Sequence, residues 1–137
     1  MKTFFDSSAF AKRYVDEPGS ERVDSLCMAV SELGLCVLCV PEILSAMNRR
    51  LRERRLKRDE YELIKRRLLE EVVDATIIDL TPAVIAVAVA ALERSAVRAA
   101  DAMHVAAAAV WGAERFVSAD QQQLAAARKA GLKVMAI

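Results

Sequence analysis

Short apolar runs alternate along the chain with longer stretches in which apolar residues recur at helical spacing. Five of the runs have the length of strands and cover residues 3–5, 35–40, 75–80, 115–117 and 132–137. These runs are nearly continuous rather than alternating, as expected for strands that are covered on both faces. We therefore predict a three-layer α/β fold, in which a parallel sheet lies between two layers of helices.

The stretches between the runs carry the apolar stripes of amphipathic helices. One stripe runs from Leu44 to Leu51 and a second from Tyr61 to Val72. Residues 82–94 are apolar almost all round, which predicts a fully buried helix. Charged residues interrupt the apolar pattern near 95–98, so we expect one helix to end there and another to begin.

Proline and glycine mark the expected ends of these helices. Three prolines stand where helices would begin, because the missing N–H costs nothing at that position. Three glycines follow helical stretches and precede apolar runs, which is the position of a left-handed C-terminal cap. They are Pro18, Pro41 and Pro82, and Gly34, Gly112 and Gly131. No linker-like segment divides the chain, so we expect one domain over residues 1–137.

Composition and charge narrow the class of protein. The chain is 55% hydrophobic and 28% charged, which excludes a disordered chain, and its 4 glycines and 3 prolines are too few for a turn-rich all-β fold. The net charge is only +1, but residues 49–67, the basic segment, hold ten basic side chains against four acidic ones. That segment is either a surface for RNA phosphates or a solvated helical face.

The sequence gives no sign of a membrane segment or a secretory leader. Asp6 interrupts the apolar N-terminus after two phenylalanines, and no apolar stretch is long enough to span a bilayer. The chain has 3 cysteines, an odd number, and no leader precedes them. We therefore expect a reduced, cytoplasmic protein with no membrane association.

Four acidic residues lie at positions where they could bind a ligand or take part in catalysis. Asp6, Glu42 and Asp120 follow predicted strands, and Asp101 lies in an apolar stretch. Ligands of open α/β sheets bind at the carboxyl ends of the strands. Helix capping explains any one of these acids alone, and Asp120 with Gln123 fits a capping box. Four carboxylates at one edge would repel each other unless a hard cation such as Mg²⁺ or Mn²⁺ neutralised them.

The remaining inventory of the sequence excludes several other kinds of site. His104 is the one histidine, so a pair of histidines for acid–base cleavage of RNA is not available. The chain has neither a Gly-rich phosphate loop nor a Gly-x-Ser-x-Gly turn around a nucleophilic serine. A site of carboxylates and a metal ion is the main catalytic possibility left.

At these acidic residues the chain resembles the PIN domain, and specifically the VapC-type toxin ribonucleases of bacterial toxin–antitoxin pairs. Four stretches carry the resemblance in order along nearly the whole chain. They are Phe4-Phe5-Asp6-Ser7-Ser8-Ala9, Val40-Pro41-Glu42-Ile43 with Arg49, Arg98-Ala99-Ala100-Asp101-Ala102-Met103-His104-Val105-Ala106, and Phe116-Val117-Ser118-Ala119-Asp120 followed by Ala130-Gly131-Leu132.

The resemblance implies a five-stranded parallel sheet of order 3-2-1-4-5. It implies that one pocket holds Mg²⁺ or Mn²⁺ and cleaves RNA through a metal-activated water, leaving a 3′-hydroxyl and a 5′-phosphate. The residues assigned to that pocket are the catalytic and metal-binding Asp6, Glu42, Asp101 and Asp120, with Ser7 and Ser118 as hydroxyls beside the acids. It also implies a homodimer and a neutralising antitoxin protein. Many relatives carry a further charged residue after Asp120, whereas glutamines follow here, so a fifth acidic ligand is missing.

Each candidate RNA-binding residue also has a simpler explanation that involves no RNA. They are Arg49, Arg54, Arg55, Arg58, Arg98 and His104. Arg98 either pairs with Asp101 or contacts a phosphate, and His104 is either a ligand or phosphate contact or a buried, hydrogen-bonded histidine.

Two other functions are compatible with the same class of fold. One is a catalytically silent module that binds nucleic acid or protein. The other is a phospho-acceptor receiver domain, which the sequence disfavours because Asp6 is the one acid after the first strand.

Overall fold

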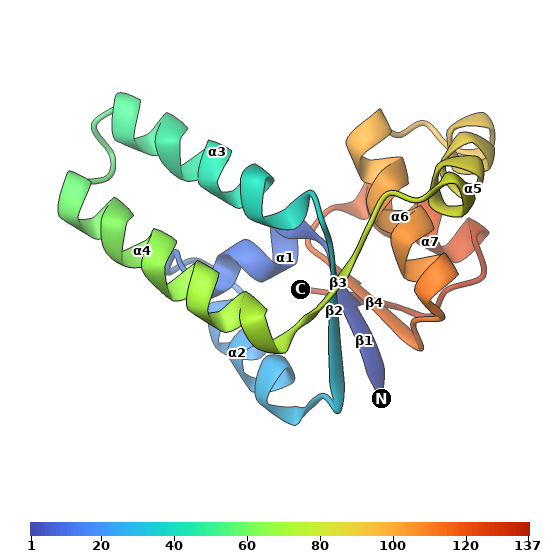
Figure 1. Ribbon diagram of the computed structural model, residues 1–137, viewed down its shortest axis with the longest axis horizontal. Helices are drawn as coiled ribbons and strands as arrows, with labels where there is room; N and C mark the ends of the chain where they lie inside the picture. The colour runs from blue at the N-terminus through green and yellow to red at the C-terminus, as the bar shows by residue number, and fades with distance from the viewer.

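The computed structural model describes residues 1–137, and a parallel sheet of five strands in the order β3-β2-β1-β4-β5 forms its centre (Figure 1). The strands are β1 Lys2–Phe5, β2 Glu32–Cys36, β3 Thr76–Ile78, β4 Arg115–Ser118 and β5 Val134–Ala136. All four strand pairs are parallel. The sheet order predicted from the resemblance is confirmed.

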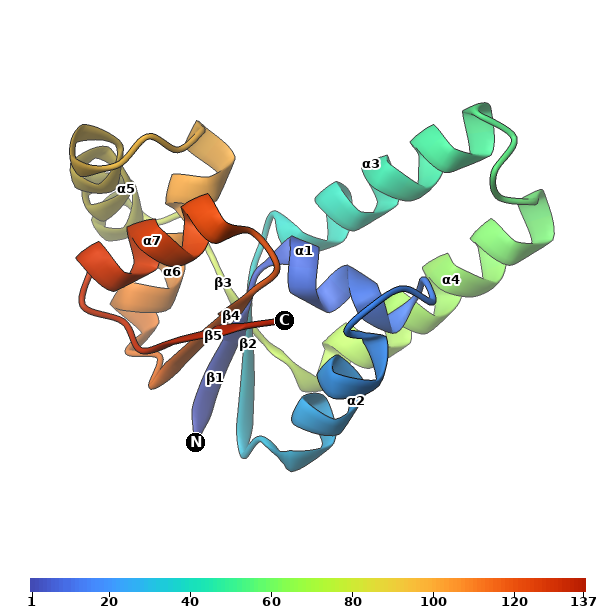
Figure 2. The ribbon, with the colours of Figure 1, turned by 180° about the vertical axis from the view of Figure 1, so that it is seen from behind.

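Helices cover both faces of this sheet. They are α1 Ser7–Phe10, α2 Ser20–Ala29, α3 Cys39–Arg52, α4 Arg58–Glu71, α5 Pro82–Arg94, α6 Ala99–Trp111 and α7 Gln121–Lys129, with 3₁₀ turns η1 Ala11–Arg13 and η2 Val72–Asp74. Figures 1 and 2 show α5, α6 and α7 on one side of the sheet and α1, α2 and α4 on the other. The α3–α4 hairpin extends well beyond the sheet.

Two separate apolar cores explain why the strand sequences do not alternate. Phe4 and Phe116 belong to the core under α5, α6 and α7, where their rings stack with centroids 5.5 Å apart. Their neighbours Phe5 and Val117 point the other way, into the core under α1, α2, α3 and α4. Successive residues of a strand therefore face two buried surfaces, as the continuous apolar runs predicted.

The second strand lies earlier in the chain than the apolar run of residues 35–40 predicts. β2 ends at Cys36, and α3 begins at Cys39, whose side chain is buried like that of a strand residue. The predicted helix cap at Gly34 is wrong, because this glycine lies inside β2. A Cβ atom there would stand 2.4 Å from the ring of Trp111, so the strand needs a residue without a side chain at that position.

The helix at residues 82–94 is present but only partly buried, so the expectation of full burial is wrong. α5 packs one face onto α6, while Ile85, Val89 and Leu92 are between 38% and 49% exposed on its outer face. The break predicted near residues 95–98 is confirmed, since α5 ends at Arg94 and α6 begins at Ala99. No helix combines the length and the apolar character needed to cross a membrane.

Polar contacts hold the α3–α4 hairpin in place. The hydroxyl of Tyr14 donates a hydrogen bond to Glu71 of α4 at 2.6 Å, and Arg13 pairs with the same carboxylate at 3.0 Å. Burial, reinforced by this hydrogen bond, raises the pKa of Tyr14 above its ordinary value. Asn48 of α3 donates to the hydroxyl of Tyr61 of α4 at 2.9 Å. These contacts fix the end of α4 against the segment after α1 and join α4 to the middle of α3.

Candidate active site

Asp6 is a buried carboxylate at the carboxyl end of β1. Its side chain is 1% exposed and is surrounded by donors. Ser118 donates to Oδ2 at 2.5 Å, while Ser8 and the backbone N–H of Ala9 donate to Oδ1 at 2.8 and 2.9 Å. Burial raises the pKa of Asp6 above its ordinary value, although these hydrogen bonds act in the opposite direction. The surroundings therefore hold the side chain of Asp6 in one orientation.

Asp120 follows the neighbouring strand β4 and is joined to Asp6 through Ser118. The Ser118 hydroxyl that donates to Asp6 also accepts the backbone N–H of Asp120 at 2.9 Å. Asp120 caps α7, because its Oδ1 accepts the backbone N–H groups of Gln122 and Gln123 at 2.8 and 3.3 Å. Its Oδ2 accepts no hydrogen bond from the protein and is free for a ligand.

Glu42 lies in the first turn of α3 and is joined to a buried histidine. Its Oε1 accepts a hydrogen bond from Ser7 at 2.8 Å and is also bonded to Nε2 of His104, which is 2% exposed. Burial raises the pKa of Glu42, but the hydrogen bond and charge of His104 together with the hydrogen bond from Ser7 outweigh this effect, so the pKa is lower than usual. Its Oε2 accepts no hydrogen bond from the protein.

Asp101 occupies the first turn of α6, one turn before His104. Its carboxylate makes no hydrogen bond with the protein and is partly exposed. The backbone carbonyl of Asp101 accepts a hydrogen bond from the side chain of Gln123 at 3.3 Å, which ties α6 to the start of α7. Gln123 thus does not complete the capping box with Asp120. The pairing of Arg98 with Asp101 is absent, since no salt bridge joins them.

Contacts therefore link the elements that carry the four acids, although no three acid, histidine or cysteine side chains lie close enough to hold one metal ion. Ser118 joins β1 to β4, His104 joins α6 to α3, and Gln123 joins α7 to α6. Oxygens without protein donors remain on Glu42, Asp101 and Asp120. Such oxygens are ligands that hard divalent cations prefer.

A groove of about 680 Å³ begins at Glu42 and follows α3 toward the tip of the hairpin. Its lining includes four of the chain's arginines, namely Arg49, Arg50, Arg55 and Arg98. Arg54 and Arg58, which were also predicted to bind RNA, do not line it. His104 is buried beneath the edge of the sheet, so its burial does not support the predicted contact with RNA.

Two residues of the site were missed by the analysis of the sequence. Ser8 bonds both to Asp6 and to the backbone N–H of Ala119 at 3.1 Å, so it holds together the loops after β1 and β4. Gln123 is 3% exposed and bridges α6 and α7. A serine three residues after a strand carries little signal of its own, and the position of Gln123 suggested a cap rather than a contact with another helix.

Comparison with known proteins gives the family of this fold. The family model of the PIN domain matches residues 3–129, and the chain belongs to that family. No curated protein matches it by sequence.

Solved structures of low sequence identity share the fold. FitAcB from Neisseria gonorrhoeae superposes with a TM-score of 0.72 at 15% identity, covering 97% of this chain and 96% of that one. VapBC2 from Rickettsia felis, bound to a DNA fragment from its promoter, has a TM-score of 0.72 at 10% identity, with 100% and 99% covered. VapC20 from Mycobacterium tuberculosis, described as a sarcin-ricin loop cleaving toxin, has a TM-score of 0.70 at 16% identity, with 90% and 94% covered.

Proposed function

We propose that this protein is a metal-dependent endoribonuclease that acts as the toxin of a toxin–antitoxin pair. The observation that carries the proposal is the set of hydrogen bonds linking the elements of Asp6, Glu42, Asp101 and Asp120 at the carboxyl edge of a PIN-domain sheet. The likeness to a sarcin-ricin loop cleaving toxin supports RNA as the class of substrate.

The donor set of the site suits Mg²⁺ or Mn²⁺. Mg²⁺ is commonly held by one or two carboxylates together with waters and substrate phosphates, so it does not need three protein ligands. When bound, such an ion polarises a phosphate and lowers the pKa of a water molecule enough to make it a nucleophile. One or two of the carboxylates of Glu42, Asp101 and Asp120, which have free oxygens, would hold it together with waters.

The remaining groups of the site position these ligands. Asp6 is enclosed by donors, so its role is to hold Ser118 and the loop that carries Asp120, and to add negative charge beneath the ion. Ser7 fixes Oε1 of Glu42, and Ser118 fixes Oδ2 of Asp6. Each serine thus orients an acid, as a hydroxyl beside a metal ligand does.

The arginine-lined groove supports a path for the RNA strand. Arg49, Arg55 and Arg98 are exposed there, and a phosphodiester backbone that enters the site beside Glu42 would meet them in succession. Contacts of this kind are independent of the base sequence, and they contribute less to affinity as the salt concentration rises. We assign Arg49, Arg55 and Arg98 to phosphates, whereas Arg54 and Arg58 have no place in this groove.

Two protein partners complete the proposal. The likeness to a toxin–antitoxin complex from Klebsiella pneumoniae, with a TM-score of 0.69 at 12% identity, supports an antitoxin that covers the site, and RNA as substrate implies a cytoplasmic location. The exposed apolar stripe of Ile85, Val89 and Leu92 on α5 supports a homodimer, with a second copy of this chain as its occupant.

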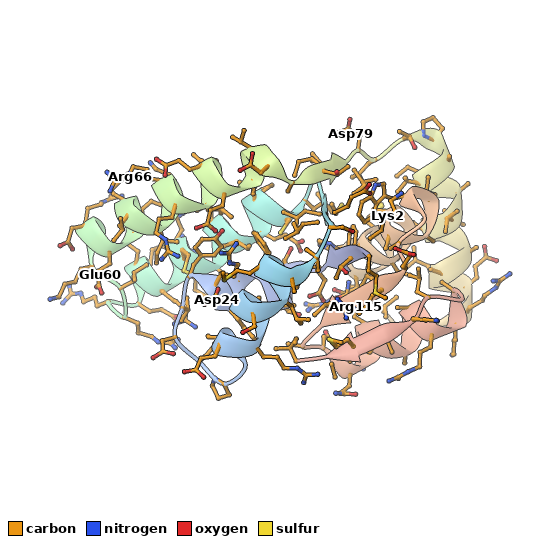
Figure 3. All side chains as sticks on the ribbon, turned by 90° about the horizontal axis from the view of Figure 1, so that it is seen from below. Lys2, Asp24, Glu60, Arg66, Asp79 and Arg115 are labelled. Carbon is orange, nitrogen blue, oxygen red and sulfur yellow. The ribbon has the colours of Figure 1, made fainter.

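Cleavage of total RNA by the purified protein tests the activity. We expect cleavage with Mn²⁺ or Mg²⁺ and none with a chelator, and products that end in a 3′-hydroxyl and a 5′-phosphate. The control is Asp79→Asn, because Asp79 is exposed after the edge strand β3, two strands away from β1, and its side chain makes no hydrogen bond or ion pair (Figure 3). RNA binding without cleavage in every metal would instead indicate the catalytically silent module.

A pair of double variants with equal loss of charge tests the groove. Arg49→Gln with Arg55→Gln removes two groove arginines, and Arg54→Gln with Arg58→Gln removes two outside it. We expect the first pair to weaken RNA binding at low salt and to lower the slope of log affinity against log salt by roughly 1.4, and the second to change neither. If only antitoxin binding falls, the groove serves the protein partner.

A further inference from the structure

His104 is the most deeply buried polar side chain near the site that the proposed chemistry does not use. It projects from the middle of α6 and is 2% exposed. Its ring meets Phe4 edge to face, with centroids 6.3 Å apart. Nε2 is bonded to Oε1 of Glu42 and lies 3.3 Å from the hydroxyl of Ser7. Through this nitrogen, α6 is joined to α3.

The other nitrogen of the ring, Nδ1, is buried and has no hydrogen-bond partner. A buried polar atom without a partner costs free energy, and an apolar side chain of similar size would avoid that cost. The polar contacts of the ring are therefore confined to its Nε2 edge, at Glu42 and Ser7. Because Oε1 of Glu42 is a carboxylate oxygen that can only accept, Nε2 carries the proton of this bond.

We propose that His104 is a positioning residue, which holds the Glu42 carboxylate by one oxygen and leaves the other free to bind a divalent cation. Glu42 is otherwise half-exposed on the first turn of a long helix, and the hydroxyl of Ser7 is its one other anchor. Two donors to Oε1 restrict the rotation of the carboxylate and leave Oε2 without a protein donor. The consequence for metal binding rests on the proposed function; the link between the two side chains does not.

This role differs from that of an ordinary core histidine in what its loss would do. A residue kept for packing supports stability, so removing its polar atoms would leave the metal site unchanged. A positioning residue supports the ligand, so an apolar replacement would leave the fold as stable or more stable and weaken the site. Partners of metal ligands of this kind change metal affinity by about 10- to 100-fold when they are lost.

Three variants of the full-length protein separate these roles. His104→Gln places an amide donor where Nε2 stands, His104→Asn places the same group nearer Nδ1, and His104→Leu removes both polar positions. The affinity for Mn²⁺ is measured without RNA by electron paramagnetic resonance, and the midpoint of unfolding is measured on the same samples. We expect His104→Gln to stay within about 3-fold of the wild type, and the Asn and Leu variants to lose about 10-fold or more.

The results distinguish a failure of the positioning role of His104 from a failure of the proposed function. Equal Mn²⁺ affinity in the wild type and all folded variants would overturn the positioning role and leave the proposed function standing. The link itself is read without metal from the ¹⁵N signals of the imidazole. If Nε2 carries the proton and its ¹⁵N signal shifts in Glu42→Gln, the link between His104 and Glu42 is supported. This holds even if the wild type binds no Mn²⁺ and cleaves no RNA. A proton on Nδ1 with a bare Nε2 overturns the inference in either case.

Discussion

Replacing Asp6 by Asn is expected to make the protein more stable at neutral pH while removing its activity. The side chain of Asp6 is 1% exposed, and burial raises its pKa. The ionised form is thus disfavoured in the folded protein relative to the unfolded chain, and Asn removes that penalty. Asn keeps an oxygen for the donors Ser8 and Ala9, and its amide can donate to the hydroxyl of Ser118, which can turn to accept it.

The sign of the pH dependence follows from the raised pKa. The folded protein holds the Asp6 proton to higher pH than the unfolded chain does, so this contribution to stability is fully present below the unfolded value of about 4 and is lost as pH rises through the folded pKa. Each unit of elevation corresponds to about 1.4 kcal/mol at neutral pH. Because the amide bonds replace charge-assisted ones, we expect a net gain of about 0.5–2 kcal/mol for Asp6→Asn.

Urea unfolding from pH 3.5 to pH 7.5 without metal measures this difference. Asp6→Asn and the wild type should have nearly equal free energies of unfolding at the acid end, and the variant should become progressively more stable toward neutrality. Asp79→Asn, at an exposed site, should follow the wild type to within about 0.5 kcal/mol. A variant that is less stable than the wild type at pH 7 would refute the reasoning, because the carboxylate would then stabilise the fold.

Three further predictions concern the fold and its assembly. Gly34→Ala should lower the free energy of unfolding by about 1–3 kcal/mol, because the new Cβ would meet the Trp111 ring; in a Trp111→Ala background, urea titration should show little or no loss. Arg54→Gly should raise the free energy of unfolding by about 1 kcal/mol in the same assay, since the backbone of Arg54 is left-handed with φ of 57°. Sedimentation should show the 15.1 kDa chain as a dimer and Val89→Asp as a monomer; a wild-type monomer would contradict the dimer.

The order of elements could be predicted from the sequence, because local signals mark most of their boundaries. Pro82 begins α5, and Gly112 ends α6 in a left-handed conformation. The start of α3 could not be predicted in this way, since Cys39 is as buried as a strand residue. The role of Gly34 depends on Trp111, which is distant in the chain and contributes nothing to a local pattern.

Three of the acids could be singled out because they follow predicted strands whose ends meet at one edge of the sheet, and Asp101 because it lies in an apolar stretch. Their connections could not be predicted, because these depend on which way side chains from different helices point. Nothing in the sequence near His104 indicates Glu42 as its partner, and Ser8 and Gln123 have ordinary local roles in their own elements. The resemblance to the PIN domain supplied the grouping of the acids, whereas the hydrogen bonds became visible only in the structure.

The central claim is that the four acids form one site for metal-dependent cleavage. The most direct measurement is the rate of Mn²⁺-dependent RNA cleavage by Asp6→Asn, Glu42→Gln, Asp101→Asn and Asp120→Asn. Asp79→Asn is the matched control for these variants. We predict that each of the four lowers the rate at least about 100-fold, equivalent to about 2.7 kcal/mol, while remaining folded, and that Asp79→Asn keeps the wild-type rate. Near-full activity in any of the four would remove that residue from the site, and activity in all four would contradict the account.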